Sequence, residues 1–250
     1  MRRISLLLGL GLAALVTAPA LAAEVSAAVA ANFTKPAEEL GKAFTAKTGD
    51  TVNFSFGATG QLYTQLSQAA PFEVFLSADN RRPAQAVKEG FAVDGTVFTY
   101  AAGTVVLYAP RLDVTDGEAV LKANAFQHLS VADPKTAPYG AAAMEALDKL
   151  GLTEALTPKI VTGENISQAL QFIDSGNAEL GFVALSQVID KPVTQVWRVP
   201  AELYAPILQD AVLTKAGAGN PAAKAFLEFL QSDEGKAIIE KYGYEVGSAE

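Results

Sequence analysis

Short apolar segments typical of β-strands alternate with amphipathic segments typical of α-helices along most of this chain. VSAAVA at 25–30 precedes a segment in which Ala37, Leu40 and Phe44 recur at helical spacing. Further strands are predicted over 52–56, 72–78, 103–110, 128–133, 159–163, 179–186, 194–200 and 210–217. Strand–helix alternation at this spacing predicts an α/β fold with mainly parallel sheets and helices on both faces.

The alternation falls into two runs, which are followed by two closing helices. Asn220 and Pro221 supply the first closing helix with a capping residue and a proline at its first position. No low-complexity linker separates the runs, which predicts two lobes joined by extended crossovers near 101–109 and 201–212. We expect lobe 1 to comprise residues 23–102 and 206–250, and lobe 2 to comprise residues 103–205.

Residues 1–22 have the parts of a secretory signal peptide. Arg2 and Arg3 are followed by an apolar run over 4–16 and by an A-x-A-like end at 20–22. The alternative is an N-terminal membrane anchor, but the run is shorter than the ~20 residues that span a bilayer. We therefore expect cleavage after Ala22 and a mature protein that works outside the cytoplasm.

The composition excludes several classes of partner. The formal net charge is −8 and the Lys and Arg residues are scattered, so no basic surface for nucleic acid or an anionic membrane is expected. The absence of cysteine excludes disulfide bonds, thiol chemistry and thiolate metal sites. A single histidine, His128, cannot supply the clustered ligands of a zinc or transition-metal site.

The sequence also contains few candidate catalytic groups. Nucleophilic hydrolysis needs a base beside the nucleophile, and His128 begins an apolar strand while no G-x-S-x-G motif occurs. The segment GATG at 57–60 lacks the Gly-Lys-Ser/Thr of a P-loop. Asp79, Asp133 and Glu164 stand near predicted strand ends, where a catalytic carboxylate could lie. We expect a protein that is not an enzyme, with an exported hydrolase as the alternative from a different class.

Five predicted strand-to-helix loops share the same kind of composition. They lie at 30–34, 57–60, 77–80, 136–140 and 163–167. They are rich in small and polar residues, and none contains a basic side chain. Ligands bind beyond the carboxyl ends of strands in open α/β sheets, and the first N–H groups of a helix favour anions. One such loop is typically only a helix cap. Five together predict a site where neutral donors hold a desolvated anion.

Four longer segments carry a family resemblance: VSAAVAANFTKPAEELGKAFTAKTG, FSFGATGQLYTQL, APFEVFLSADN and ADPKTAPYGAAAMEALDKLG, together with EKYGY near the end. They resemble the periplasmic molybdate-binding proteins, which are the solute receptors of ATP-binding cassette importers. The resemblance covers nearly the whole mature chain. It implies a type II periplasmic binding protein fold, a tetrahedral oxyanion between two lobes, a periplasmic monomer and an importer permease as partner.

The resemblance also implies a set of ligand-binding residues. In the first lobe it places Asn32 where many members have Ser, with Ala31 beside it offering only its backbone. Thr59 falls at the position of a hydroxyl donor. In the second lobe Tyr139 falls where common members have Ala, and Ile166 falls where a Val donates its backbone N–H.

The implied ligand is molybdate, and by near-identity of size and charge tungstate, with no cofactor and no direct protein–metal ligand. A further Tyr of the family corresponds to Ala184, and Tyr139 is expected to supply the hydroxyl missing there. Sulfate and phosphate remain alternatives, because the sequence does not measure the size of a site. Ferric ion would favour several Tyr or carboxylate ligands, of which only Tyr139 is in position.

Overall fold

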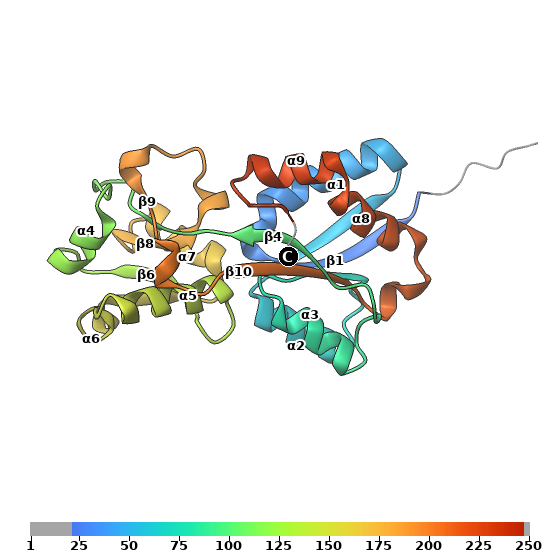
Figure 1. Cartoon of the computed structure of the whole chain (residues 1–250), viewed down its shortest axis with the longest axis horizontal. Coiled ribbons are helices and arrows are strands. Elements are labelled where there is room, and N and C mark those ends of the chain that lie inside the picture. The colour runs from blue at the N-terminus through green and yellow to red at the C-terminus, as the bar shows by residue number, and fades with distance from the viewer. Residues whose placement is uncertain (1–21, 248–250) are drawn as a thin grey trace, which may run out of the picture.

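The computed structural model describes residues 22–247, and the expected signal peptide, apart from Ala22, lies outside the described residues. The described chain forms two lobes, each built on a five-stranded sheet (Figure 1). The first sheet has the order β2-β1-β3-β10-β4, and its strands are β1 (Glu24–Ala30), β2 (Thr51–Gly57), β3 (Val74–Leu76), β4 (Phe98–Gly103) and β10 (Ile207–Leu213). The second sheet has the order β7-β6-β8-β5-β9, and its strands are β5 (Val105–Tyr108), β6 (Leu129–Ala132), β7 (Ile160–Gly163), β8 (Leu180–Ala184) and β9 (Val196–Arg198).

Both sheets are mainly parallel, as predicted. In the first sheet only β10 is reversed, since it pairs antiparallel with both β3 and β4 while β1 pairs parallel with β2 and β3. In the second sheet only β5 is reversed, between β8 and β9. The expected α/β fold with two lobes is therefore confirmed.

The helices of the first lobe are α1 (Thr34–Thr48), α2 (Thr59–Ser67), α3 (Arg81–Lys88), α8 (Pro221–Gln231) and α9 (Asp233–Lys241). Those of the second lobe are α4 (Gly117–Ala123), α5 (Pro138–Lys149), α6 (Thr153–Leu156) and α7 (Ile166–Asp174). Short 3₁₀ turns are η1 (Ala31–Phe33), η2 (Thr157–Lys159), η3 (Leu185–Gln187), η4 (Val193–Gln195), η5 (Ala201–Leu203) and η6 (Ala216–Gly219). No helix among the described residues is long and apolar enough to cross a membrane.

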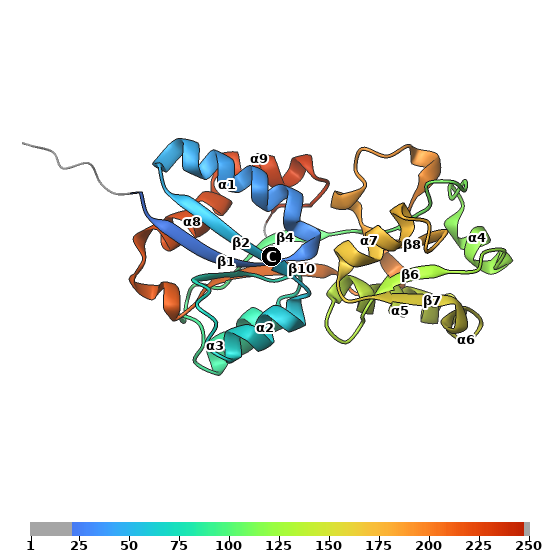
Figure 2. The same ribbon diagram turned by 180° about the vertical axis from the view of Figure 1, so that it is seen from behind.

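The first sheet is buried on both faces, with α1, α8 and α9 on one side and α2 and α3 on the other (Figure 2). The side chains of β1 alternate between the two layers, as the period of a strand requires. Val25, Ala27 and Val29 belong to the core under α1 and α8, whereas Ala28 belongs to the core over α2 and α3. This two-sided burial explains why β1 is continuously apolar from Ala27 to Ala30.

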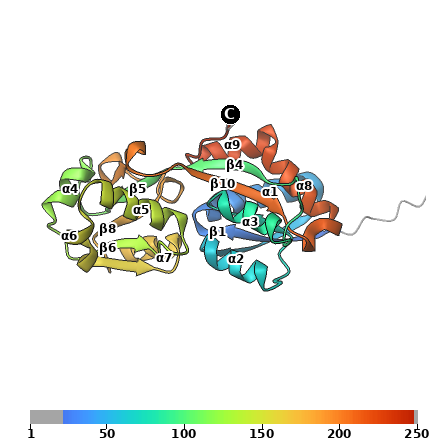
Figure 3. The ribbon, with the colours of Figure 1, turned by 60° about the horizontal axis from the view of Figure 1, so that its bottom comes forward.

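The second sheet repeats this arrangement with α5 and α7 on opposite faces (Figure 3). In β5, Val105 and Leu107 pack in the core that includes α5, whereas Val106 and Tyr108 pack with Ile173 of α7. Each sheet therefore stands between helical layers. In each sheet, the carboxyl ends of the parallel strands lead into helices that start on the side of the other lobe.

The two closing helices return the chain to the first lobe, where α8 contacts β1 and β10 and α9 contacts α1. The chain passes between the lobes at 103–105, from β4 to β5, and again at 198–207, from β9 to β10. The first passage links its strands directly, and the second contains only the short 3₁₀ turn η5 (Figure 1).

Candidate functional site

A small cavity of about 10 Å³ lies between the lobes, and it gathers residues from five separate loops. The residues implied by the family resemblance all line it: Ala31, Asn32, Thr59, Tyr139 and Ile166. The remaining lining residues are Ala30, Gly57, Ala58, Ala78, Ala137 and Pro138. The wall is therefore made mostly of small residues, which let a ligand approach the backbone closely.

Helix starts converge on this cavity from both lobes. α2 begins at Thr59, α5 at Pro138 and α7 at Ile166, and the 3₁₀ turn η1 begins at Ala31. The first N–H groups of a helix have no acceptor within it, and the helix dipole makes them electropositive. In the described structure the backbone N–H groups of Asn32, Thr59, Tyr139 and Ile166 donate to no other protein group. These groups can meet an anion from two sides.

Thr59 adds a hydroxyl group to the backbone donors. Its Oγ1 accepts a hydrogen bond of 3.0 Å from the N–H of Ala78, and its side chain is buried. Because the oxygen accepts in that bond, the hydroxyl proton remains for an acceptor in the cavity. Thr59, which the resemblance implies as a hydroxyl donor, lies at the wall of the cavity.

Asn32 enters the site differently from the expected side-chain contact. Its Nδ2 donates to Gln209 Oε1 at 2.8 Å and to Tyr244 Oη at 2.9 Å, which engages both amide protons within the protein. The backbone N–H is therefore the donor that Asn32 offers to the cavity. Gln209 and Tyr244 were not singled out from the sequence, because nothing local connects them with this loop.

Tyr139 also has a partner within the protein. Its hydroxyl accepts a hydrogen bond of 3.3 Å from Gln209 Nε2, on β10, and the whole side chain is buried. Burial raises the pKa of Tyr139 well above its usual value, and the neighbouring Tyr244 and Tyr100 raise this pKa further. The hydroxyl therefore stays neutral in a group of buried polar side chains beside the passages between the lobes.

The expectation that Tyr139 supplies the hydroxyl missing at Ala184 stays a prediction. Ala184 is fully buried at the end of β8, and its N–H donates to Gln187 Oε1 at 3.0 Å. It is absent from the residues that line the cavity in the described chain. The Tyr139 oxygen accepts from Gln209 Nε2 and keeps its own proton for another acceptor, so Tyr139 can offer both its hydroxyl and its backbone N–H.

The lobes contact each other directly around the cavity. The N–H of Gly60 in α2 donates to the carbonyl of Thr136 at 2.9 Å, across the gap between the lobes. Ser167 Oγ donates to the carbonyl of Ala31 at 3.3 Å, and Lys35 Nζ donates to the carbonyl of Gln187 at 3.2 Å. The structure is therefore that of a closed cleft.

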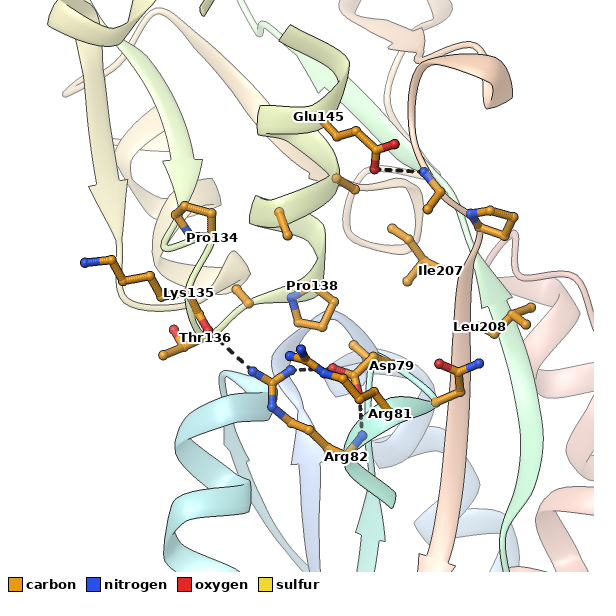
Figure 4. Close-up of a pocket in the computed structure, with 17 residues that line it drawn as sticks. Asp79, Arg81, Arg82, Pro134, Lys135, Thr136, Pro138, Glu145, Ile207 and Leu208 are labelled. Atoms are coloured by element: carbon orange, nitrogen blue, oxygen red, sulfur yellow. Dashed lines mark hydrogen bonds and ion pairs between the residues drawn. The ribbon is translucent and has the colours of Figure 1, made fainter. Parts of the chain in front are cut away.

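A larger pocket of about 300 Å³ opens beside this cavity, and Figure 4 shows its charged side chains. Arg82 pairs with the carboxylate of Asp79 and reaches across the cleft, where its Nη2 donates to the carbonyl of Lys135 at 3.4 Å. The five loops themselves contain no basic residue, and Arg82 was not among the residues predicted for the site. The feature of the sequence that could have identified Arg82 is its position in the first turn after the 77–80 loop.

The other candidates from the sequence lie outside this site. His128 Nδ1 lies 3.9 Å from Glu179 Oε2, and both side chains are largely exposed. Asp133 accepts from the N–H of Lys135, as a residue in an ordinary turn does. No group of His, Cys, Asp and Glu side chains that could hold a metal ion occurs within the described residues.

Comparison with known proteins gives consistent matches across the chain. The family model described as bacterial extracellular solute-binding protein matches residues 25–245. A molybdate-binding protein of Rhodobacter capsulatus is 57% identical over 242 residues, covering 96% of this chain and 93% of that protein. A molybdate-binding protein of Azotobacter vinelandii is 52% identical, covering 97% of this chain and 96% of that protein.

One solved structure agrees closely with the fold. A periplasmic molybdate-binding protein of Azotobacter vinelandii superposes with a TM-score of 0.86 at 37% identity, covering 90% of this chain and all of that chain. The resemblance to molybdate-binding proteins that was expected from the sequence is confirmed by these matches. This chain belongs to the bacterial extracellular solute-binding protein family.

Proposed function

We propose that this protein binds molybdate outside the cytoplasm and delivers it to the permease of an ATP-binding cassette importer. The observation that carries the proposal is the single cavity on which the five predicted residues converge from both lobes. The relatives named as molybdate-binding proteins support the same ligand. A receptor of this kind needs no catalytic group, and we propose no enzymatic activity.

The donors suit an anion that carries no proton. We assign the contacts to the Thr59 hydroxyl and to the backbone N–H groups of Ala31, Asn32, Thr59, Tyr139 and Ile166. Molybdate can accept from all of these groups, whereas hydrogen phosphate also carries a proton that needs an acceptor. The lining residues of the described chain include neither Asp nor Glu, which disfavours phosphate.

The size of the cavity favours a small ion. With a volume of about 10 Å³ it falls far below the ≈ 300–1,000 Å³ typical of sites for organic ligands. Hydrogen bonds to a charged group contribute about 1.5–3 kcal/mol each, so a full set of donors offsets the cost of removing a small dianion from water. Tungstate has nearly the same size and charge and is proposed as a second ligand.

The remaining expectations form part of this proposal. We propose a cleaved signal peptide over 1–22, a monomeric periplasmic protein and no nucleic-acid partner. We propose lobe 1 as residues 23–102 and 206–250, and lobe 2 as residues 103–205. The two short passages between the lobes then act as the hinge for closure over the ligand.

Isothermal titration calorimetry on residues 23–250 tests the ligand. We expect molybdate and tungstate to bind with sub-micromolar affinity, and sulfate and phosphate to bind far more weakly. Sulfate binding as tight as molybdate binding would overturn the assignment. Turnover of ester, glycoside or phosphate substrates would overturn the proposal that the protein is a receptor.

A further inference from the structure

The segment after the last helix runs back beside the hinge. Ala102 of β4 and Glu245 exchange two backbone hydrogen bonds, with the N–H of Ala102 donating at 2.8 Å and the N–H of Glu245 donating at 3.1 Å. This pairing adds the segment to the edge strand of the first sheet, next to the passage at 103–105. Tyr244, which precedes Glu245, is thereby directed into the molecule and is only 5% exposed.

The Tyr244 hydroxyl closes a ring of hydrogen bonds with Asn32 and Ser186. Its oxygen accepts from Asn32 Nδ2 at 2.9 Å, and it lies 2.9 Å from Ser186 Oγ, to which it donates. Ser186 Oγ in turn donates to the carbonyl of Asn32 at 2.8 Å. The Asn32 carbonyl also lies 2.9 Å from the Tyr244 hydroxyl, as an alternative acceptor for its proton. The Tyr244 hydroxyl, the Ser186 hydroxyl, and the Asn32 side-chain nitrogen and carbonyl are thus linked by hydrogen bonds.

The ring joins the two lobes. Asn32 belongs to η1 in the first lobe, whereas Ser186 belongs to η3 in the second, after β8. Tyr244 reaches both of them from the C-terminal segment, which is anchored to the first lobe. The complete ring requires the lobe positions seen in this closed structure.

We propose that Tyr244 is a positioning residue for anion binding, which fixes the Asn32 turn beside the cavity and ties it to Ser186 when the cleft closes. This inference rests on the proposed function of the cavity. Because Asn32 offers its backbone N–H, the orientation of its peptide decides where that donor points. Both the side-chain amide and the carbonyl of Asn32 are held by the ring, which leaves the turn little freedom.

The ring stabilises closure without touching the anion. The observed affinity of a binding protein is the affinity of its competent state multiplied by the fraction of molecules in that state. Tyr244 should therefore raise the affinity for every oxyanion by the same factor and leave the preference among them unchanged. Burial, as the largest cause, raises the pKa of Tyr244 to about 12, so the hydroxyl keeps its proton at neutral pH.

The test compares Tyr244→Phe with Tyr242→Phe. Tyr242 lies two residues earlier and donates to Glu39 Oε2 at 2.7 Å within the first lobe, so it provides a matched control. We expect Tyr244→Phe to weaken molybdate binding about 5- to 50-fold, through loss of one to two buried hydrogen bonds. The dissociation rate should rise, and the ratio of molybdate to sulfate affinity should stay constant. An unchanged affinity, or an equal loss in Tyr242→Phe, would overturn the inference.

A double-mutant cycle with Ser186→Ala tests the ring from the second lobe. We expect the losses from Tyr244→Phe and Ser186→Ala to be smaller together than their sum, because each variant breaks the same ring. Additive losses would overturn the inference, and so would an unchanged affinity in Ser186→Ala alone, which can be measured even if Tyr244→Phe proves unstable. Failure of the wild-type protein to bind molybdate would refute the proposed function instead, and the cycle would then be run with sulfate as the probe.

Discussion

The hydroxyl of Tyr139 lies directly over the α-carbon of Gly103. A β-carbon at Gly103 would stand only 2.0 Å from this hydroxyl and 2.7 Å from Gln209 Nε2. Gly103 ends β4 in the first lobe, whereas Tyr139 opens α5 in the second. This contact places one of the predicted site residues against the hinge, and it permits closure only because residue 103 has no side chain.

We therefore expect Gly103→Ala to weaken molybdate binding at least tenfold, or about 1.4 kcal/mol. The added methyl group obstructs the closed arrangement, so the melting temperature without ligand should fall much less than the affinity. Calorimetry and thermal unfolding on the same samples measure both effects. Gly219→Ala is the control, since a β-carbon there meets no atom within 4 Å.

The double variant Gly103→Ala/Tyr139→Phe separates this contact from a general effect on the hinge. Removing the hydroxyl takes away the atom nearest to the new methyl group, so part of the affinity lost in Gly103→Ala should return. A double variant that binds more weakly than either single variant would contradict the proposed clash.

Thr59→Val should weaken molybdate binding by about 1.5–3 kcal/mol, because the anion loses a hydroxyl donor. Valine has nearly the same shape as threonine, so the packing changes little. Thr59→Ser keeps the hydroxyl and should bind within a few-fold of the wild type. The comparison is needed because Thr59 Oγ1 also accepts from the N–H of Ala78, a bond that valine removes and serine retains. Equal affinities for the serine and valine variants would show that the hydroxyl does not contact the anion.

Molybdate should make the protein more compact in solution. The closed structure holds the lobes together through few direct contacts, such as the 2.9 Å bond from the N–H of Gly60 to the Thr136 carbonyl. We expect the radius of gyration from small-angle scattering to decrease when saturating molybdate is added, and to decrease less in Tyr244→Phe at the same subsaturating concentration. Superimposable wild-type curves with and without ligand would argue against a hinge.

Asp210→Asn should raise the melting temperature at neutral pH. Burial is the main cause that raises the pKa of Asp210, and the nearby Asp79 also raises it. A raised pKa means that the folded state disfavours the charged form, so the wild type loses stability as the pH rises through this pKa. The advantage of the asparagine variant should therefore be largest at pH 7 and shrink as the pH falls toward 4.

Asp113→Asn is a control for which the expected shift in melting temperature has the opposite sign. The hydroxyl and the N–H of Thr115 both donate to Asp113, and they lower the pKa of this exposed carboxyl. Its stabilising contribution is present above its unfolded pKa and is lost as the pH falls through the folded value. We expect a lower melting temperature for this variant at pH 7 and a shrinking difference in acid. The same sign of shift for both variants would contradict this assignment of causes.

Much of the fold could be predicted because its signals are local. The apolar period of α7 and the proline and asparagine that open α8 identify these helices from neighbouring residues alone. The strand β4 was missed, since FTYAAG at 98–103 lacks clear alternation and was taken for part of a crossover. It is a strand because β10 returns from the far end of the chain to pair with it.

In the candidate site, too, some features follow from local sequence and others only from tertiary contacts. The sequence by itself determined which loops open helices and so present unpaired N–H groups, and the family resemblance indicated which residues of those loops line the cavity. Only the tertiary structure decided what their side chains do. The partners of the Asn32 amide lie 177 and 212 residues away along the chain, at Gln209 and Tyr244. No local period encodes such contacts, since they exist only after two lobes and the C-terminal segment have packed around one hinge.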